Sequence, residues 1–217
     1  MPYSYEYPRP MVTVDILIFR YHKLKIETLL IQRKKEPFKD RWAIPGGFIE
    51  INETLLNAAR RELLEETALR EIPLLPLTYA DHPDRDPRGR TISFVFGGIL
   101  PPPFQMPRPR DDARALEWFP IESAPDLAFD HNQLIKNCCE IFKEQLRSNF
   151  GIVAFLETSF SKRNLERCCE VMFNSRDMAA LLIKRGLETG ALKPEKPGHF
   201  KRMVSISELY QNNLTLV

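Results

Sequence analysis

In the first part of the chain, apolar and β-branched residues gather in short runs separated by polar and turn residues, a pattern that predicts strands. The runs MVTVDILIFR at 11–20 and KIETLLIQR at 25–33 are rich in β-branched residues, and the short joint between them predicts a hairpin or meander. Further strands are expected within 90–100 and 113–121, and a helix is expected to begin near Thr54. Strands around one strongly patterned helix predict a mixed α/β (α+β) domain.

The pattern changes after the first 130 residues. Apolar residues at helical spacing predict a connecting helix over 131–149, and two shorter helices within 159–186. The segment 190–210 is rich in turn residues and predicts a β-hairpin. Helix, helix, helix and hairpin is the order of a winged helix-turn-helix. We therefore expect an α/β domain at 1–130, a connecting helix at 131–149 and a winged-helix-like domain at 150–217.

Composition adds few constraints. Apolar residues at 43%, charged residues at 28% and a net charge of +2 describe an ordinary soluble protein, and give no argument for nucleic-acid or membrane binding. No apolar run is long enough for a transmembrane helix, and the first residues lack the apolar core of a signal peptide. The four cysteines form two adjacent pairs, at 138–139 and 168–169, without metal-ligand spacing. Buried free thiols and a cytoplasmic location are expected.

The stretch RRELLEETALR at 60–70 crowds three like charges onto one turn of the expected helix. At 100° per residue, Glu62, Glu65 and Glu66 share about a quarter of the helix circumference. Arg61 precedes Glu65 by four residues, so an ion pair between them is expected. Such a cluster is either a solvated acidic face or a site for a hard divalent cation. The adjacent sector supplies a core face of Leu56, Ala59 and Leu63.

The spacing around this cluster is more informative than its charge. From Gly47 onward the chain follows the pattern G-x5-E-x7-R-E-U-x-E-E-x-G-U, where U is apolar, and Ala68 is the single departure. This resembles the Nudix box, the signature of the Nudix hydrolase superfamily. The matching positions are Gly47, Glu53, Arg61, Glu62, Leu63, Glu65, Glu66 and Leu69.

The resemblance implies a Nudix fold, with a mixed sheet sandwiched by helices, and hydrolysis of a nucleoside diphosphate linked to another moiety. It implies that Glu62, Glu65 and Glu66 bind Mg2+ or Mn2+, and that the carbonyl of Gly46 is a further ligand. Arg61 is implied to orient one glutamate. The remaining catalytic residues are Glu53, which supports the loop-helix geometry, and Glu65, a carboxylate suited to take the proton of the attacking water.

In many relatives an assisting acid comes from a loop outside the box. Asp111 and Asp112 precede an expected strand and are the candidates here, Asp112 foremost. The alternative is an ordinary acidic loop or Asx turn.

Three arginines, Arg85, Arg88 and Arg90, precede another expected strand. They are either solvated charges of a turn or phosphate-binding groups. The string RDPRGR is similar to one in Nudix proteins that act on or sense ADP-ribose, so these arginines are candidates for substrate binding. Phe38 and Trp42 either stack on a ligand or, as we favour, pack.

A Nudix domain followed by a winged helix resembles the Nudix-related transcriptional regulators. The alternative function is therefore an ADP-ribose-responsive, DNA-binding regulator, with homodimerisation as a family expectation. The tail from 151 onward carries a mild excess of positive charge, which permits phosphate contacts. A packing or dimerisation role for the tail is equally open. The candidate DNA contacts are Lys162, Arg163, Arg176, Lys184, Arg185, Lys201 and Arg202.

Ala68 stands where the box has glycine. A glycine there ends the helix in a left-handed conformation, which costs alanine about 1 kcal/mol or more. Either Ala68 accepts this strain, or the helix continues through Leu69 and Arg70. The box retains every charged position, which favours catalysis over sensing, but an intact site can also serve a sensor that hydrolyses slowly, so dual function stays open.

Overall fold

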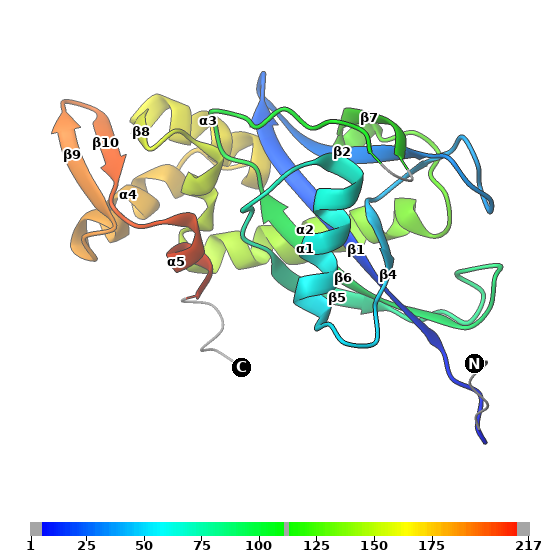
Figure 1. The fold of residues 1–217 in the computed structure, drawn as a ribbon. Coiled ribbons are helices and arrows are strands. Elements are labelled where there is room, and N and C mark those ends of the chain that lie inside the picture. Colours follow the sequence, from blue (N-terminus) through cyan, green and yellow to red (C-terminus); the bar gives the residue numbers. More distant parts are fainter. Residues whose placement is uncertain (1–5, 111–112, 212–217) are drawn as a thin grey trace.

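The structure is a computed structural model that describes residues 6–110 and 113–211. Seven strands of the described residues form one mixed sheet with the central order β3-β2-β1-β6-β5, while β4 pairs with β1 and β7 with β2 (Figure 1). The pairing of β1 with β6 is parallel and the others are antiparallel. The strands are β1 (Met11–His22), β2 (Lys25–Arg33), β3 (Trp42–Ala43), β4 (Gly46–Phe48), β5 (Leu75–Ala80), β6 (Thr91–Ile99) and β7 (Ala113–Pro120).

Two helices cover the two faces of this sheet, α1 (Leu55–Thr67) and α2 (His131–Asn149). Side chains alternate across β1, so Val14 and Ile16 pack in the α1 layer, whereas Leu17 and Phe19 pack in the α2 layer. The Phe19 ring stacks on Phe142 of α2 with ring centroids 4.9 Å apart. The sheet sandwiched by helices is the fold that the sequence predicts.

The C-terminal unit follows α2 through a short 3-10 helix, η2 (Gly151–Phe155). Helices α3 and α4 pack together, and a small sheet of order β8-β10-β9 joins them. This is the expected winged helix-turn-helix, with β9 and β10 as the wing at the left of Figure 1. The elements are β8 (Ser159–Ser161), α3 (Lys162–Phe173), α4 (Met178–Glu188), β9 (Leu192–Lys196), β10 (His199–Arg202) and α5 (Ile206–Gln211).

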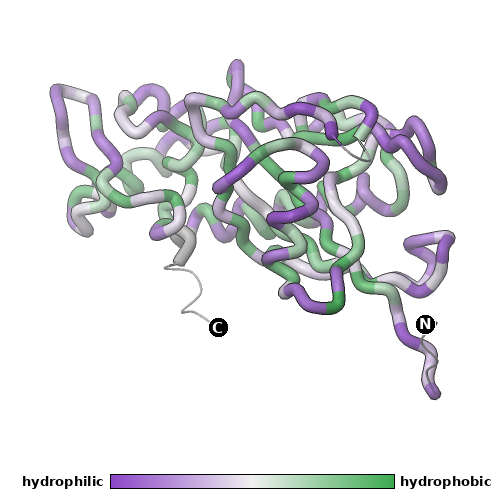
Figure 2. Tube along the Cα trace, in the orientation of Figure 1, coloured by the Kyte–Doolittle hydropathy of each residue, from purple (hydrophilic) through white to green (hydrophobic). Residues whose placement is uncertain are grey.

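One apolar cluster joins the two units, because it runs from Phe19 through Leu146 of α2 to Phe155 and Leu165. Figure 2 shows apolar residues along the central strands and helices, with polar residues gathered in loops and in the wing. The four cysteines are buried free thiols, as expected, and burial raises the pKa of Cys138 to about 12. Within the described part of the chain, no helix has the length and apolarity needed to cross a membrane.

Candidate active site

Helix α1 is capped at both ends by its own sequence. Thr54 Oγ1 accepts a hydrogen bond from the amide of Asn57 at 3.3 Å, which satisfies one of the free N–H groups of the first turn. At the other end Ala68 adopts a left-handed conformation (φ 60°, ψ 10°), and its amide donates to the carbonyl of Leu64 at 3.0 Å. The first of the two alternatives for Ala68 is therefore correct: the helix ends where a glycine would end it.

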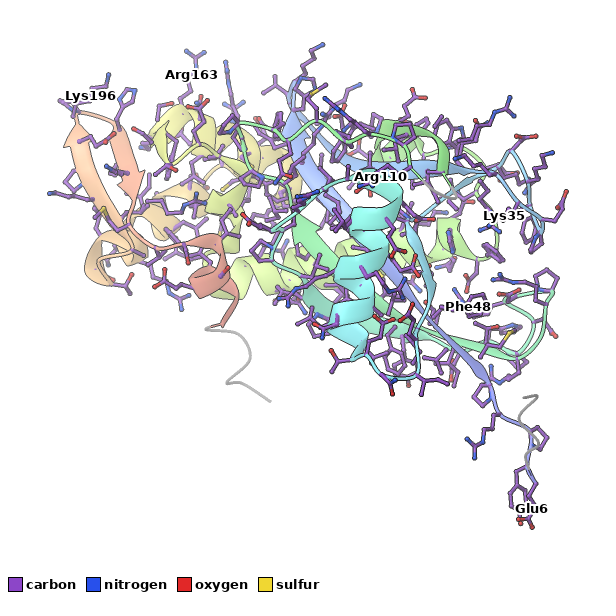
Figure 3. All side chains as sticks on the ribbon, viewed as in Figure 1. Glu6, Lys35, Phe48, Arg110, Arg163 and Lys196 are labelled. Carbon is purple, nitrogen blue, oxygen red and sulfur yellow. The ribbon has the colours of Figure 1, made fainter. Side chains whose placement is uncertain are left out.

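A second segment closes the last turn of α1. The amides of Arg108 and Arg110 donate to the carbonyls of Thr67 and Glu66, at 2.9 and 3.3 Å. Figure 3 labels Arg110 beside this end of the helix. These bonds satisfy carbonyls that a helix C-terminus otherwise leaves free, and they hold the acidic turn in place.

Arg61 is the centre of the acidic cluster. Its guanidinium donates to both oxygens of Glu53, at 2.6 and 3.1 Å, and to the carbonyl of Phe48 at 2.9 Å. The Nη1 atom donates to Glu62 Oε1 at 2.8 Å and to Glu65 Oε2 at 3.2 Å, so the expected pair with Glu65 is present. The Arg61 guanidinium thus holds the β4–α1 loop and two of the three glutamates in place.

The two glycines of the Pro-Gly-Gly turn lie directly against the acidic helix. The Gly46 amide donates to Glu66 Oε2 at 2.8 Å. A Cβ built on Gly47 would lie 2.5 Å from Cδ of Glu62, far inside contact distance. Gly47 is therefore required because the Glu62 carboxylate occupies the space of its missing side chain.

The glutamates differ in exposure and in proton affinity. The side chain of Glu65 is 43% exposed, that of Glu62 is 13% exposed, and Glu66 is buried. Burial raises the pKa of Glu62 above its usual range, although the hydrogen bond from Arg61 opposes this. The same arginine lowers the pKa of Glu53 through its hydrogen bonds. The pKa values of Glu62 and Glu53 are therefore shifted in opposite directions, by burial in the first case and by hydrogen bonds from Arg61 in the second.

A cavity of about 660 Å3 opens beside this helix face. Arg61 and all three glutamates line it, together with Gly46 and Gly47, so the structure brings the box residues to one wall. Basic side chains from the end of β2 and the residues after it also line the cavity: Arg33, Lys34 and Lys35. Figure 3 shows Lys35 and Phe48 on the same side of the molecule. The cavity therefore combines acidic and basic walls, as a metal-assisted phosphate site requires.

A buried polar network forms the floor of the cavity. Arg85 donates to both oxygens of Asp130, at 2.8 and 3.0 Å, and lies 3.4 Å from Asp15 Oδ2. Asp15 also accepts a 2.5 Å hydrogen bond from Ser93 Oγ. His131 Nδ1 accepts a hydrogen bond from the amide of Ile44 at 2.9 Å, so this buried histidine has a structural partner.

Of the three candidate substrate arginines, two line the cavity. Arg85 belongs to the floor and already contacts two carboxylates. Arg88 pairs with the buried Asp86 at 2.6 Å, and its guanidinium lies over the ring of Phe48, 4.8 Å from the centroid. Arg90 is exposed, donates to the carbonyl of Asp81 and is not among the lining residues.

Two aromatic residues that line the cavity, Phe48 and Phe129, were not predicted from the sequence. Phe48 directly follows the two glycines, and Phe129 lies beside Arg88, with its centroid 5.5 Å from the guanidinium. Phe38 and Trp42 pack, as expected: Phe38 contacts Phe129 edge-on, and Trp42 contacts Phe119. The candidate acids Asp111 and Asp112 lie outside the described residues.

The donor set fits a magnesium-type ion, but not as a ready-made cage. Among residues 6–110 and 113–211, no three acidic, histidine or cysteine side chains converge closely enough to enclose a metal. Mg2+ commonly takes only a few carboxylates and completes its shell with waters and substrate phosphates. Glu62, Glu65 and Glu66 offer hard oxygen donors on one cavity wall, so their chemistry matches this demand.

The candidate DNA contacts lie on the C-terminal unit and are exposed apart from the half-buried Arg202. Three of them form ion pairs with carboxylates: Lys162 with Glu166, Arg176 with Glu170, and Lys184 with Glu188, at 3.6, 2.8 and 3.9 Å. Arg163 extends from the start of α3 (Figure 3). The outer face of α4 also exposes Leu181 and Leu187, so this helix is less basic than its position in the fold suggests.

Comparison with known proteins finds one relative that matches 60% of this chain and another that matches 87% of it. An "ADP-ribose pyrophosphatase" of Methanocaldococcus jannaschii is 44% identical over 138 residues, which span 60% of this chain and 74% of that protein. An "ADPR responsive transcriptional repressor NtrR" of Acinetobacter baylyi is 27% identical over 87% of this chain and 76% of its own length.

A solved structure shares the fold of most of this chain. The crystal structure of Shewanella oneidensis NrtR complexed with a 27mer DNA superposes with a TM-score of 0.74 over 92% of this chain and 95% of that chain, at 22% identity. A family model described as "NUDIX domain" matches residues 9–138. This match spans the sheet, α1 and every residue that lines the cavity, and the chain therefore belongs to the NUDIX domain family.

Proposed function

We propose that this Nudix pyrophosphohydrolase cleaves the diphosphate of ADP-ribose, or of a closely related nucleoside diphosphate derivative, with the help of Mg2+ or Mn2+. The observation that carries the proposal is the position of Arg61, which holds Glu53, Glu62 and Glu65 on the wall of the 660 Å3 cavity. The names of the two relatives, a pyrophosphatase for ADP-ribose and a repressor responsive to it, support this substrate.

Different residues of the cavity have different roles in the proposed hydrolysis. Glu62, Glu65, Glu66 and the Gly46 carbonyl would hold a divalent cation, which would neutralise charge on the diphosphate and lower the pKa of the attacking water. Glu65 is the most exposed of the three carboxylates, and it takes the proton of that water. The water oxygen bonds to phosphorus while the bridging P–O bond breaks, which releases AMP and ribose 5-phosphate. Asp112 is a further candidate for the proton acceptor.

Substrate recognition is assigned to the arginines and aromatic residues that line the same cavity as the glutamates. The guanidinium of Arg88 lies 4.8 Å from the ring centroid of Phe48 and 5.5 Å from that of Phe129, and these groups offer flat, cationic and aromatic contacts for an adenine or a phosphate. Arg85 is already bound by Asp15 and Asp130, so its contribution to binding is to hold the floor, or to contact the substrate with its remaining donors.

The test is product analysis with purified full-length protein. ADP-ribose, GDP-mannose and dGTP are each supplied with Mg2+, and the released nucleotides are quantified. We expect AMP and ribose 5-phosphate from ADP-ribose, with kcat/KM at least about tenfold above that for the other two. Preferred hydrolysis of dGTP would replace the substrate assignment, and absence of any nucleotide product with Mg2+ or Mn2+ would refute the enzyme itself.

The C-terminal unit supports a second function, an ADP-ribose-responsive regulator that binds DNA. Its support is the helix–helix–wing arrangement of α3, α4, β9 and β10, together with the repressor that matches 87% of the chain. The basic side chains of α3 and β10 would contact phosphates. Mobility-shift assays with genomic promoter fragments test this: salt-sensitive retention that ADP-ribose relieves supports it, and no retention at low salt retires it.

A further inference from the structure

A second cavity, of about 350 Å3, lies where the α/β unit meets the C-terminal unit. The turn between β1 and β2 and the loop residue Phe104 line it from the first unit. Phe160, Asn164 and Arg167 of β8 and α3 line it from the second. It shares no lining residue with the cavity beside α1, so a ligand bound here would not occupy the proposed substrate site.

The turn that borders this cavity carries unusual residues for its geometry. His22 pairs with Lys25, so Lys23 and Leu24 are the two central residues, and both have positive φ, 48° and 61°. Turns of this type are most stable as Asn-Gly, since a left-handed backbone costs other residues roughly 1 kcal/mol each. Leu24 is in addition 54% exposed. Lys23 and Leu24 are thus strained at the backbone, and their cationic and apolar side chains lie at the cavity.

The lining combines apolar walls with a net positive charge. Phe104, Phe155 and Phe160 contribute rings, whereas Lys23 and Arg167 contribute cations against the single carboxylate of Glu157. Neither cation forms an ion pair within the described residues. The hydroxyl of Tyr21, another lining residue, is buried and has no hydrogen-bond partner among the described residues. Apolar walls with a few polar groups are typical of small-molecule pockets between domains.

We infer that this cavity binds a small organic anion, an aromatic ring that carries a carboxylate. The rings of the lining contact its flat body, and Arg167 and Lys23 bind its carboxylate. A volume of 350 Å3 is near the low end of ligand pockets, which begin at about 300 Å3, so it suits a single substituted ring better than a dinucleotide. Because both units line the cavity, the bound anion contacts the α/β unit and the C-terminal unit together.

Benzoate and its neutral amide, benzamide, are the matched probes, with binding to the full-length protein measured by ligand-observed NMR and calorimetry. We expect saturable benzoate binding with a Kd of about millimolar order, as befits so few atoms, and at least fivefold weaker binding of benzamide. Arg167→Gln weakens benzoate binding at least fivefold. Lys193→Gln is the control, because it removes the same charge from an exposed position on β9 outside the cavity.

The turn provides a test that loss of folding cannot imitate. The double variant Lys23→Asn, Leu24→Gly installs the favourable turn sequence, so the melting temperature stays level or rises while benzoate binding weakens at least fivefold. Equal binding of benzoate and benzamide would overturn the inference. So would benzoate binding that neither Arg167→Gln nor the turn variant changes, or no saturable binding at all. Hydrolysis of ADP-ribose does not enter any of these readouts, so the inference stands apart from the proposed function.

Discussion

Gly47 and Glu62 are in such close contact that a Cβ on the glycine would lie 2.5 Å from the glutamate Cδ. The obstructing atoms belong to the end of a flexible side chain, so Gly47→Ala displaces the carboxylate while the backbone stays in place. A shift of about 1 Å at a catalytic group can cost about 100-fold in rate. We expect kcat/KM to fall by this order while the melting temperature changes little.

The same contact can be isolated in a double-mutant cycle. If Gly47→Ala acts through Glu62, the double variant with Glu62→Gln is no slower than the slower single variant. If the double variant instead showed the product of the two single losses in kcat/KM, Gly47 would act independently of Glu62, which would contradict the role assigned to the contact.

Glu62→Gln should separate activity from stability. Burial raises the pKa of Glu62, so the folded state binds its proton more tightly than the unfolded state, and stability falls as the pH rises above the ordinary value of 4.5. At neutral pH the wild-type protein must hold this carboxylate ionised. We therefore expect Glu62→Gln to lose activity, yet to melt at or above the wild-type temperature at pH 7.5, with any gain shrinking at pH 5. A clear loss of stability at pH 7.5 would contradict this.

Ala68 is strained, and the strain is local. Its left-handed backbone is disfavoured for alanine, so Ala68→Gly should stabilise the protein by about 1 kcal/mol, seen as about 2–4 °C in melting temperature. The glutamates lie at least two residues earlier and are held by Arg61 and Gly46, so turnover should stay within about twofold. An increase by orders of magnitude would mean that Ala68 weakens the box and would favour the regulator.

His131 links the start of α2 to the floor of the cavity. His131→Phe leaves the amide of Ile44 without its acceptor, which should cost about 1–3 kcal/mol in urea unfolding. Burial lowers the pKa of His131, so the unfolded state binds the proton more tightly and wild-type stability falls as the pH drops below about 6.5. The variant should lose less stability than wild type between pH 7.5 and 5.5. An equal loss would assign the pH dependence to other groups.

The parts of the molecule set by local spacing were predictable from sequence. The Arg61–Glu65 pair, the start of α1 after Thr54 and the two faces of β1 follow from helix and strand periodicity alone. By contrast, β5 contains Pro76 and an irregular register, which hid it among loop signals.

The wall and floor of the cavity depend on contacts between distant segments. Asp15 meets Arg85 across 70 positions of sequence, and Phe129 reaches Arg88 only because α2 begins beside β3 and β4. Nothing in the local pattern marks these residues. The aromatic residue directly after two glycines, Phe48, is the one signal that sequence reasoning could have used.

The proposed metal-assisted hydrolysis depends on the glutamates of α1. Its most direct test is a Mg2+ titration of ADP-ribose turnover for the wild type and Glu66→Gln, with melting temperatures as the control for folding. We expect Mg2+-dependent release of AMP by the wild type, and a loss of at least about 100-fold in a variant that still melts cooperatively. Equal turnover by the two proteins, or wild-type turnover that chelation leaves unchanged, would contradict it.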